Sequence, residues 1–462
     1  MPTTLTASGL AGFRDRFSGQ LIGPDDPDYD RARIVWNAMA DRRPAVVARC
    51  EGVDDVVAAV RFAREQDLVV AVRGGGHSVA GFSTCDAGIV IDLSRMRGVS
   101  VDPGGRIARV DGGAHLSQLD QSAQAHGLVC PVGVVGHTGV AGLTLGGGMG
   151  RLQRKFGLTI DNLLSVDLVT ADGSQMRAGA DENPDLFWGI RGAGANFGVV
   201  TSFEFRLHAL DPTITVGWIA LPIERSREVA AFVREFSAGA SDDVRLAISF
   251  GIATDPPFSA EHVGKHVVFV GATHTGSAED AARDLRPLRE EMNPLVDTIA
   301  PQSYLAVQGQ QDESMAWGKR FYMKSGFVDE LGGDCIEACA ALASDVPAGG
   351  ECSITFWEQG GAFGRVPEDA MAFTGRAAHW WVGFEAMWEG HPLDESHKAW
   401  ARNAIASVKP FTSMGQYVND AVESDVGSVR AIYGDAKYER LVELKRSYDP
   451  DNVFRLNQNI RP

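Results

Sequence analysis

The sequence predicts an α+β fold, in which short buried strands in the first half are followed by longer strands and amphipathic helices. Two observations lead to this expectation. Before residue 207, short apolar runs end in glycine clusters. After residue 212, strand patterns alternate with helical ones, a mixture that favours an α+β domain built on a largely antiparallel sheet.

The expected elements follow one another along the chain. In residues 53–67, Val53, Val56, Val57 and Val60 stand at helical spacing. The other elements expected in the first half are a helix at 116–126, a hairpin turn at 171–173 and strands at 68–72, 89–93, 106–110, 163–170 and 197–207. Those expected in the second half are helices at 226–236, 277–290 and 394–408 and strands at 214–221, 244–253, 266–270, 353–357 and 379–388.

Composition excludes several classes of protein. The chain has 462 residues with 43 Lys and Arg against 60 Asp and Glu, a net charge of −17 that argues against nucleic acid or an anionic membrane as partner. The first 20 residues have no apolar core like that of a signal peptide, and no apolar run approaches the roughly 18 residues of a membrane span. A cytoplasmic protein with reduced thiols is therefore expected.

The six cysteines follow no scaffold spacing, and no metal site is predicted. Cys335 and Cys339 lie four apart in a helix-like stretch, with no histidine or further cysteine near them in sequence. They are interpreted as core residues.

A glycine cluster after the apolar run at 68–72 is the first candidate site. Arg73 is followed by Gly74, Gly75, Gly76 and His77, a sequence that lets the backbone turn sharply and brings N–H groups close to an anion. A tight turn with an incidental histidine is the structural alternative. A serine hydrolase using Ser78 is another, because residues 76–80 nearly match the G-x-S-x-G elbow, but with Ala80 in the last position.

A longer glycine-rich stretch begins at Cys130 and runs to Gly150. So many glycines are costly in ordinary structure, whereas a pyrophosphate lying close to the backbone would explain them. Neither glycine cluster has the G-x-G-x-x-G spacing, so a bound dinucleotide would not be held in the manner of NAD. Taken alone, Cys130 is either a buried structural thiol or a functional residue at the start of this loop.

Three further segments complete the pattern, at residues 183–200, 416–420 and 448–460. Together with residues 72–78 and 130–150, in this order, they resemble the berberine-bridge-enzyme branch of the vanillyl-alcohol-oxidase flavoprotein family. The similarity covers nearly the whole chain. It implies a two-domain PCMH-type FAD-binding fold, with an FAD-binding domain at 1–207, a substrate domain at 208–410 whose antiparallel sheet is covered by helices, and a segment at 411–462 that completes the FAD domain.

The resemblance also implies which residues hold FAD. His77 matches the histidine that is bonded to the flavin 8α-methyl group, and Cys130 lies where bicovalent members carry the cysteine bonded to flavin C6. Bacterial members similar to this chain lack that cysteine. The other expected FAD contacts are Arg73, Gly74, Gly75, Gly76, Ser78, Val79, Gly136, His137, Thr138, Gly139, Gly142, Gly146, Gly147, Gly148, Val199 or Val200, Tyr417 and Asn419.

The implied reaction is an oxidation of a small organic substrate. A hydride would pass from an alcohol, sugar hydroxyl or amine to flavin N5, and O₂ would reoxidise the flavin to give H₂O₂. Tyr417 matches a family tyrosine that often acts as base, although it could instead only pack beside the flavin. Glu358 is a second candidate base or substrate anchor, and Asp420 departs from the family pattern.

Four other functions stay open from the sequence. They are a monocovalent flavin-dependent oxygenase of natural-product biosynthesis, a flavin dehydrogenase that passes electrons to a carrier, a non-catalytic flavin-binding protein, and the hydrolase that would use Ser78.

Overall fold

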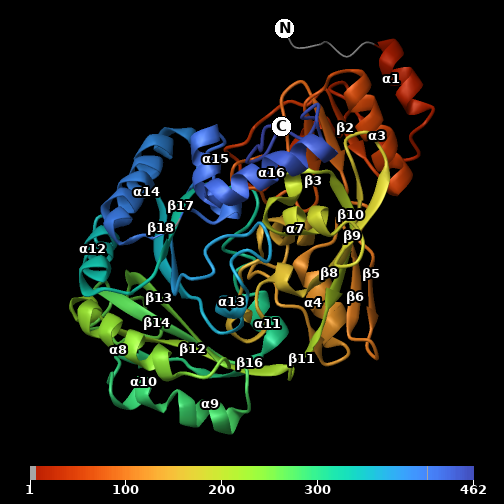
Figure 1. The fold of residues 1–462 in the computed structure, drawn as a ribbon. Coiled ribbons are helices and arrows are strands. Elements are labelled where there is room, and N and C mark those ends of the chain that lie inside the picture. Colours follow the sequence, from red (N-terminus) through yellow and green to blue (C-terminus); the bar gives the residue numbers. More distant parts are fainter. Residues whose placement is uncertain (1–6, 414) are drawn as a thin grey trace.

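The computed structural model describes residues 7–413 and 415–462, and Figure 1 shows them as two β-rich parts, with helices along the outer left of one and strands along the outer right of the other. The first six residues, which belong to the segment judged unlike a signal peptide, lie outside the described residues. Helix α1 (Ala7–Arg14) and helix α2 (Tyr29–Arg33) precede the main body of the first part.

The first sheet has the order β1-β2-β4-β3, formed by β1 (Gln20–Ile22), β2 (Val46–Arg49), β3 (Val70–Arg73) and β4 (Ile89–Asp92). Strands β2 and β3 run parallel to β4 between them. Helix α3 (Val53–Glu65) forms the crossover, and its apolar stripe, including Val56 and Val60, is fully buried. The predicted helix and the two strands after it are thus confirmed. Strand β3 ends where the first glycine cluster begins.

The second sheet is antiparallel, with the order β5-β6-β10-β8-β9. Its strands are β5 (Val99–Asp102), β6 (Ile107–Asp111), β8 (Leu163–Val169), β9 (Gln175–Gly179) and β10 (Val199–Arg206). The hairpin predicted at 171–173 joins β8 and β9. Around this sheet lie α4 (Leu116–Gln124), β7 (Leu128–Val129), α5 (Val140–Gly146), α6 (Gln153–Phe156), a 3-10 turn η1 (Thr159–Asn162), α7 (Pro184–Ala193) and η2 (Gly194–Asn196).

A large antiparallel sheet dominates the second part, with the order β15-β12-β14-β13-β18-β19-β17 and with β16 beside β12. Its strands are β12 (Thr213–Pro222), β13 (Val244–Ile252), β14 (His266–His274), β15 (Val296–Asp297), β16 (Ala300–Ser303), β17 (Arg320–Val328), β18 (Gly350–Glu358) and β19 (Trp380–Trp388). Strand β11 (His208–Ala209) pairs instead with β7. The antiparallel sheet expected from the sequence is confirmed.

Helices cover one face of this sheet, on the left of Figure 1. They are α8 (Ser226–Gly239), α12 (Gly333–Ala343) and α14 (Asp394–Val408), and their apolar residues form one core with the sheet. Cys335 and Cys339 lie in this core, as predicted. The single helix predicted at 277–290 is wrong: α9 (Ala278–Asp284) stops and α10 (Arg286–Glu290) restarts beside Pro287, whose ring cannot continue a helix. Shorter elements are η3 (Ile223–Arg225), α11 (Tyr304–Gln308), α13 (Ala362–Arg365), η4 (His391–Leu393) and η5 (Lys409–Phe411).

The end of the chain returns to the first part. After η6 (Val418–Asp420), helices α15 (Val426–Tyr433) and α16 (Asp435–Tyr448) follow, and α16 packs against α7 (Figure 1). The fully buried Lys445 ammonium donates to Asp449 Oδ2 at 2.6 Å and to the Asn196 and Phe454 carbonyl oxygens. Asp449 also accepts from the Phe454 backbone N–H. This network fixes the segment that follows α16 against the first part.

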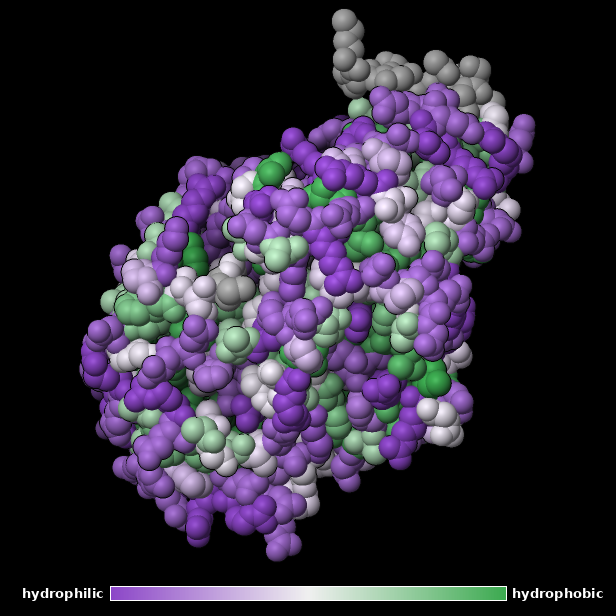
Figure 2. Space-filling model, viewed as in Figure 1, coloured by the Kyte–Doolittle hydropathy of each residue, from purple (hydrophilic) through white to green (hydrophobic). Residues whose placement is uncertain are grey.

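Hydrophilic side chains dominate the face shown in Figure 2, and hydrophobic ones are scattered among them. Within the part of the chain that the structure describes, no helix is both long and apolar enough to cross a bilayer.

Candidate active site

A cavity of about 450 Å³ lies where the two parts and the C-terminal segment meet. It lies within the size range of small-molecule and cofactor sites. Its walls come from the glycine loop after β3, the loop and helix at 133–145, strands β17, β18 and β19, the 3-10 turn η6, and residues 454–458. All five segments that the sequence singled out, at 72–78, 130–150, 183–200, 416–420 and 448–460, thus contribute to one cavity.

The two glycine loops touch where Gly75 meets Gly139. A Cβ atom on Gly75 would overlap the Gly139 backbone nitrogen, so this approach requires glycine. Gly76 has a φ of +73°, which turns the chain into His77. Gly74, Gly75, Gly76 and Gly139 all line the cavity, so backbone, rather than side chains, faces it here. Such a wall fits the pyrophosphate of a dinucleotide.

The first prediction concerns this contact. The Gly75→Ala variant is expected to lose most of its FAD, because the Gly139 backbone must move to admit a methyl group. The flavin-to-protein absorbance ratio of the purified variant measures the loss. Gly239→Ala at the end of α8 is the matched control, since nothing lies within 4 Å of a Cβ there. Wild-type flavin content in Gly75→Ala would contradict the assignment of this loop.

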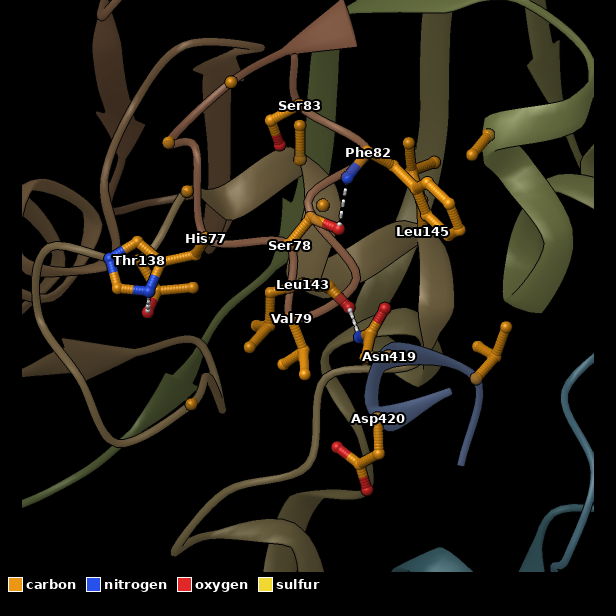
Figure 3. A pocket seen from close by; sticks show the side chains of 18 of the residues that line it. His77, Ser78, Val79, Phe82, Ser83, Thr138, Leu143, Leu145, Asn419 and Asp420 are labelled. Atoms are coloured by element: carbon orange, nitrogen blue, oxygen red, sulfur yellow. Dashed lines mark hydrogen bonds between the residues drawn. The ribbon is translucent and has the colours of Figure 1, made fainter. Parts of the chain in front are cut away.

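His77 enters the cavity from the glycine loop (Figure 3). Its ring stacks on Trp36 at 5.0 Å between centroids, and Trp317 approaches edge-on at 6.0 Å. Burial, followed by the neighbouring His137 and His115, lowers the pKa of His77 to about 3. The imidazole is therefore neutral near pH 7, which is the nucleophilic form of a histidine.

The hydrogen bonds of His77 fix its tautomer. His77 Nε2 lies 2.7 Å from His137 Nδ1, and His137 Nε2 lies 3.2 Å from the Asp312 carbonyl oxygen. A carbonyl only accepts, so His137 carries its proton on Nε2 and accepts at Nδ1. His77 Nε2–H is then the donor, and the free lone pair of His77 is on Nδ1, 3.4 Å from Thr138 Oγ1.

A second set of polar side chains, Tyr417, Asp420 and Glu385, lines the cavity from η6 with the residue before it and from β19. The Tyr417 hydroxyl oxygen accepts from the Gly148 N–H and from Asn419 Nδ2, each at 2.8 Å, and burial raises the pKa of Tyr417. Asp420 Oδ2 accepts from the Trp381 indole at 3.0 Å. Burial, opposed by hydrogen bonds and reinforced by the charge of Glu385, raises the pKa of Asp420 to about 7. Glu385 also lines the cavity, and burial raises the pKa of its carboxyl group.

Most of the predicted loop residues contact the cavity. Those that line it are Gly74, Gly75, Gly76, His77, Ser78, Val79, Thr138, Gly139, Gly142, Tyr417 and Asn419. Of the two valines considered for the adenine side, Val200 lines the cavity and Val199 is buried in the core around α3. Gly136, His137, Gly146, Gly147 and Gly148 lie behind its wall. In that layer, Gly146 packs against Asn419 and Gly147 against Tyr417.

Cys130 does not line the cavity, so the structure does not bring it together with the other residues predicted to hold FAD. The thiol is fully buried in the core with Leu116, Leu119 and Val132, and burial raises its pKa well above the usual range. A thiol in such surroundings is not the thiolate that bond formation requires. These surroundings favour the structural alternative for this cysteine.

Substitution of Cys130 is therefore expected to change the stability of the protein and not its flavin content. Cys130→Ser is expected to lower the free energy of unfolding by about 1–3 kcal/mol, because a hydroxyl replaces the thiol among apolar side chains. Cys130→Ala should keep the wild-type flavin content. Denaturant unfolding measures the first change and flavin absorbance the second. Loss of flavin from Cys130→Ala at unchanged stability would reinstate a direct role for the thiol.

Glu358 and Arg73 are also corrected, since both are committed to buried ion pairs. Glu358 Oε1 accepts from Arg154 at 2.6 Å and its Oε2 accepts from the Leu246 N–H at 2.7 Å. On this strand Trp357 faces the cavity and Glu358 points the other way, as strand alternation requires. The Arg73 guanidinium donates to Asp92 at 2.8 Å and does not line the cavity.

The hydrolase alternative finds no support in the structure. The Ser78 hydroxyl accepts from the Phe82 N–H at 3.0 Å (Figure 3). Among the described residues no histidine makes a hydrogen bond with this hydroxyl, so the base that a nucleophilic serine needs is missing.

Glu385, Trp381 and Trp36 also line the cavity, although the sequence does not predict them as site residues. A single acidic residue within the apolar strand at 379–388 was the available signal for Glu385, because alternation places it on the same face as Trp381. Trp36 gives no such signal, since it reaches His77 from a loop distant in sequence.

The comparisons with known proteins agree with this arrangement. Residues 44–179 match the family model described as FAD binding domain, and residues 416–461 match the one described as berberine and berberine like. An FAD-linked oxidoreductase of Dictyostelium discoideum is 32% identical over 92% of this chain and 91% of its own length. The structure of 6-hydroxy-D-nicotine oxidase from Arthrobacter nicotinovorans is 31% identical over 96% of this chain and 98% of that one, with a TM-score of 0.84.

A xylooligosaccharide oxidase from Myceliophthora thermophila C1 shares the fold, with a TM-score of 0.87 and 24% identity over 99% of each chain. The α+β fold predicted from the sequence is confirmed by these matches. The chain belongs to the berberine-bridge-enzyme-like family of FAD-linked oxidoreductases, and it is an FAD-dependent enzyme.

Proposed function

We propose that this enzyme is an oxidase that carries FAD covalently on His77 alone and oxidises an alcohol, sugar hydroxyl or amine, with O₂ reduced to H₂O₂. The observation that carries the proposal is that one cavity contains His77 on one wall and a buried carboxylate, Asp420, on another (Figure 3). FAD, when bound, supplies a hydride acceptor that O₂ can reoxidise. The named activities of the relatives, a hydroxynicotine oxidase and a xylooligosaccharide oxidase, support oxidase chemistry on small polar molecules.

The surroundings of His77 support attachment at this residue. Nδ1 holds the free lone pair of a neutral imidazole, and the Nε2 proton lies on a 2.7 Å hydrogen bond to His137. His137 can accept that proton as His77 forms a bond at Nδ1, and the positive charge then rests on His137, whose Nε2–H faces the Asp312 carbonyl oxygen. Stacking on Trp36 holds the ring in one orientation. The position of Cys130 in the core supports attachment through one residue rather than two.

Asp420 is the best candidate for the base that takes the substrate O–H or N–H proton. A base works best when its pKa is close to the operating pH, and that of Asp420, raised chiefly by burial, is about 7. The Trp381 N–H holds one carboxylate oxygen at 3.0 Å. Tyr417 fits this role less well, because burial and the nearby Asp420 raise its pKa further above neutrality. Its hydroxyl instead positions the Gly148 and Asn419 groups that donate to it.

The experiment that tests the function is a peroxide-coupled screen of alcohols, sugars and amines with the purified yellow enzyme. An oxidase gives stoichiometric H₂O₂ in air. Substrate oxidation that reduces the flavin, followed by slow reoxidation in air, would instead identify a dehydrogenase. Products that gain an oxygen atom from ¹⁸O₂ would identify the oxygenase alternative. An unreactive flavin across the whole panel would overturn an enzymatic role at this cavity.

A further inference from the structure

Within the described residues, two arginines near the cavity have no carboxylate paired with them. Arg245, on β13, is 5% exposed, and its Nε and Nη2 atoms are buried without a hydrogen-bond partner. Arg151, just after the glycine loop, has a buried Nε in the same condition. Among the described residues neither guanidinium has an ion-pair partner within 4.0 Å. An isolated buried charge of this kind is strongly unfavourable unless an ion compensates it.

The nearby carboxylates are already used. Glu358 is bound by Arg154 and by the Leu246 N–H. Asp243 is paired with Lys155 at 2.5 Å, and Asp242 is paired with Arg365 at 2.6 Å. The positive charge of this region therefore exceeds the negative charge that the surrounding side chains supply.

The charge of Arg151 acts on the Arg245 guanidinium. Burial is the main cause that lowers the pKa of Arg245 to about 9, and the charge of Arg151 is the next. Burial likewise lowers the pKa of Arg151. A single anion between two guanidinium groups would relieve both effects, and a carboxylate offers two oxygens to planar donors of this kind.

The pair is adjacent to the cavity through an aromatic ring. The Arg245 guanidinium carbon lies 4.6 Å from the centroid of the Trp357 ring, and Trp357 lines the cavity. On the other side Met149 lines the cavity two residues before Arg151. Ala247 pairs with Trp357, so strand alternation places Arg245 on the same face of the sheet as this cavity-lining ring.

We propose that Arg245 and Arg151 form an anion subsite that binds the carboxylate group of the substrate. This inference rests on the proposed function, because it names a substrate class for the same cavity. The reacting C–H group would lie beside Asp420 and Tyr417, and the carboxylate would lie beyond Trp357. Neutral sugars and alcohols would then be poorer substrates than hydroxy acids, sugar acids or amino acids of matching length.

The kinetic test uses matched pairs of carboxylates and their primary amides in the peroxide-coupled assay. The wild-type enzyme is expected to prefer the carboxylate, and Arg245→Gln to raise KM for it roughly 10- to 100-fold, the range for a lost charged hydrogen bond. KM for the amide should change less than about threefold, since the amide carries no charge. Arg227→Gln, an exposed arginine on α8, is the control for general electrostatics. A wild-type enzyme with no carboxylate preference would overturn the proposal.

A binding test separates failure of this proposal from failure of the oxidase assignment. Thermal unfolding by circular dichroism is compared in acetate, acetamide, sulfate and chloride at equal ionic strength. Acetate is expected to raise the Tm of the wild type but not of Arg245→Gln, and acetamide should have no effect. This result would hold even if no substrate were oxidised. Equal stabilisation by sulfate or chloride, with no carboxylate preference in the assay, would identify an inorganic ion site and contradict a substrate subsite.

Discussion

Replacing Asp420 by Asn is expected to lower kcat/KM about 10²- to 10⁴-fold for the best substrate of the peroxide-coupled screen, the range for loss of a general base. The amide keeps the size of the carboxyl group and can still accept from the Trp381 indole. What it cannot do is take a proton. Flavin content and Tm should therefore stay near their wild-type values, which separates a catalytic effect from a folding defect.

The pH dependence gives the same prediction a second readout. Asp420 must be ionised to act, so kcat/KM should rise as the pH increases through about 7, the value to which burial raises the pKa of this carboxyl. In Asp420→Asn this limb should disappear.

Glu385→Gln is the matched control for Asp420→Asn. Burial also raises the pKa of Glu385, and its carboxyl accepts from Ser353 Oγ at 3.1 Å. If Glu385 is protonated while Asp420 is ionised, kcat/KM of Glu385→Gln should fall by less than about tenfold. A larger loss in Glu385→Gln than in Asp420→Asn would reverse the two roles.

Replacing His77 by Ala is expected to abolish covalent flavin, so that acid precipitation leaves a colourless pellet. Some FAD should still bind, because the backbone wall built by Gly75 and Gly139 does not depend on this side chain. We expect a fall in activity of about tenfold or more, since the tether fixes the flavin ring and shifts its electronics. The flavin content of the pellet and of the supernatant measures the first effect, and the peroxide assay the second.

The His137→Ala variant tests whether His137 acts only as the acceptor of the proton from His77, the residue to which the flavin is attached. Without His137 the attachment at His77 should become slow rather than impossible, so that the covalent fraction grows over time when FAD is added to the apoprotein. His391→Ala, which removes an exposed histidine, should behave like the wild type. Acid-stable flavin at wild-type levels in His77→Ala would place the attachment on another residue.

Much of the fold could be predicted because local pattern determines it. The stripe of α3 and the runs that form β3 and β4 follow directly from hydrophobic spacing. The glycine loops could be predicted too. Where the two loops meet, any residue larger than glycine at position 75 or 139 would overlap the backbone of the other loop. The single helix predicted at 277–290 is wrong because hydrophobic spacing continues across the break beside Pro287, where the proline ring prevents one continuous helix.

The candidate site was predicted less completely, because orientation depends on tertiary structure. Sequence placed Cys130 before a glycine loop but could not reveal that its thiol is buried in the core to which Leu116 and Leu119 of α4 belong. Alternation put Glu358 and Trp357 on opposite faces of β18, yet which face meets the cavity depends on the packing of the whole sheet. Asp420 was recognised only as a departure from the family pattern, and its raised pKa arises from burial that no local pattern encodes.

One measurement tests the central claim most directly, namely that His77 alone carries the flavin. The wild-type protein is precipitated in acid, alkylated under denaturing conditions and digested, and the flavin-bearing peptides are sequenced by mass spectrometry. We predict a yellow pellet, one flavin peptide that contains His77, and a Cys130 peptide that is fully alkylated. A flavin on the Cys130 peptide, or a colourless pellet beneath a yellow supernatant, would contradict the account.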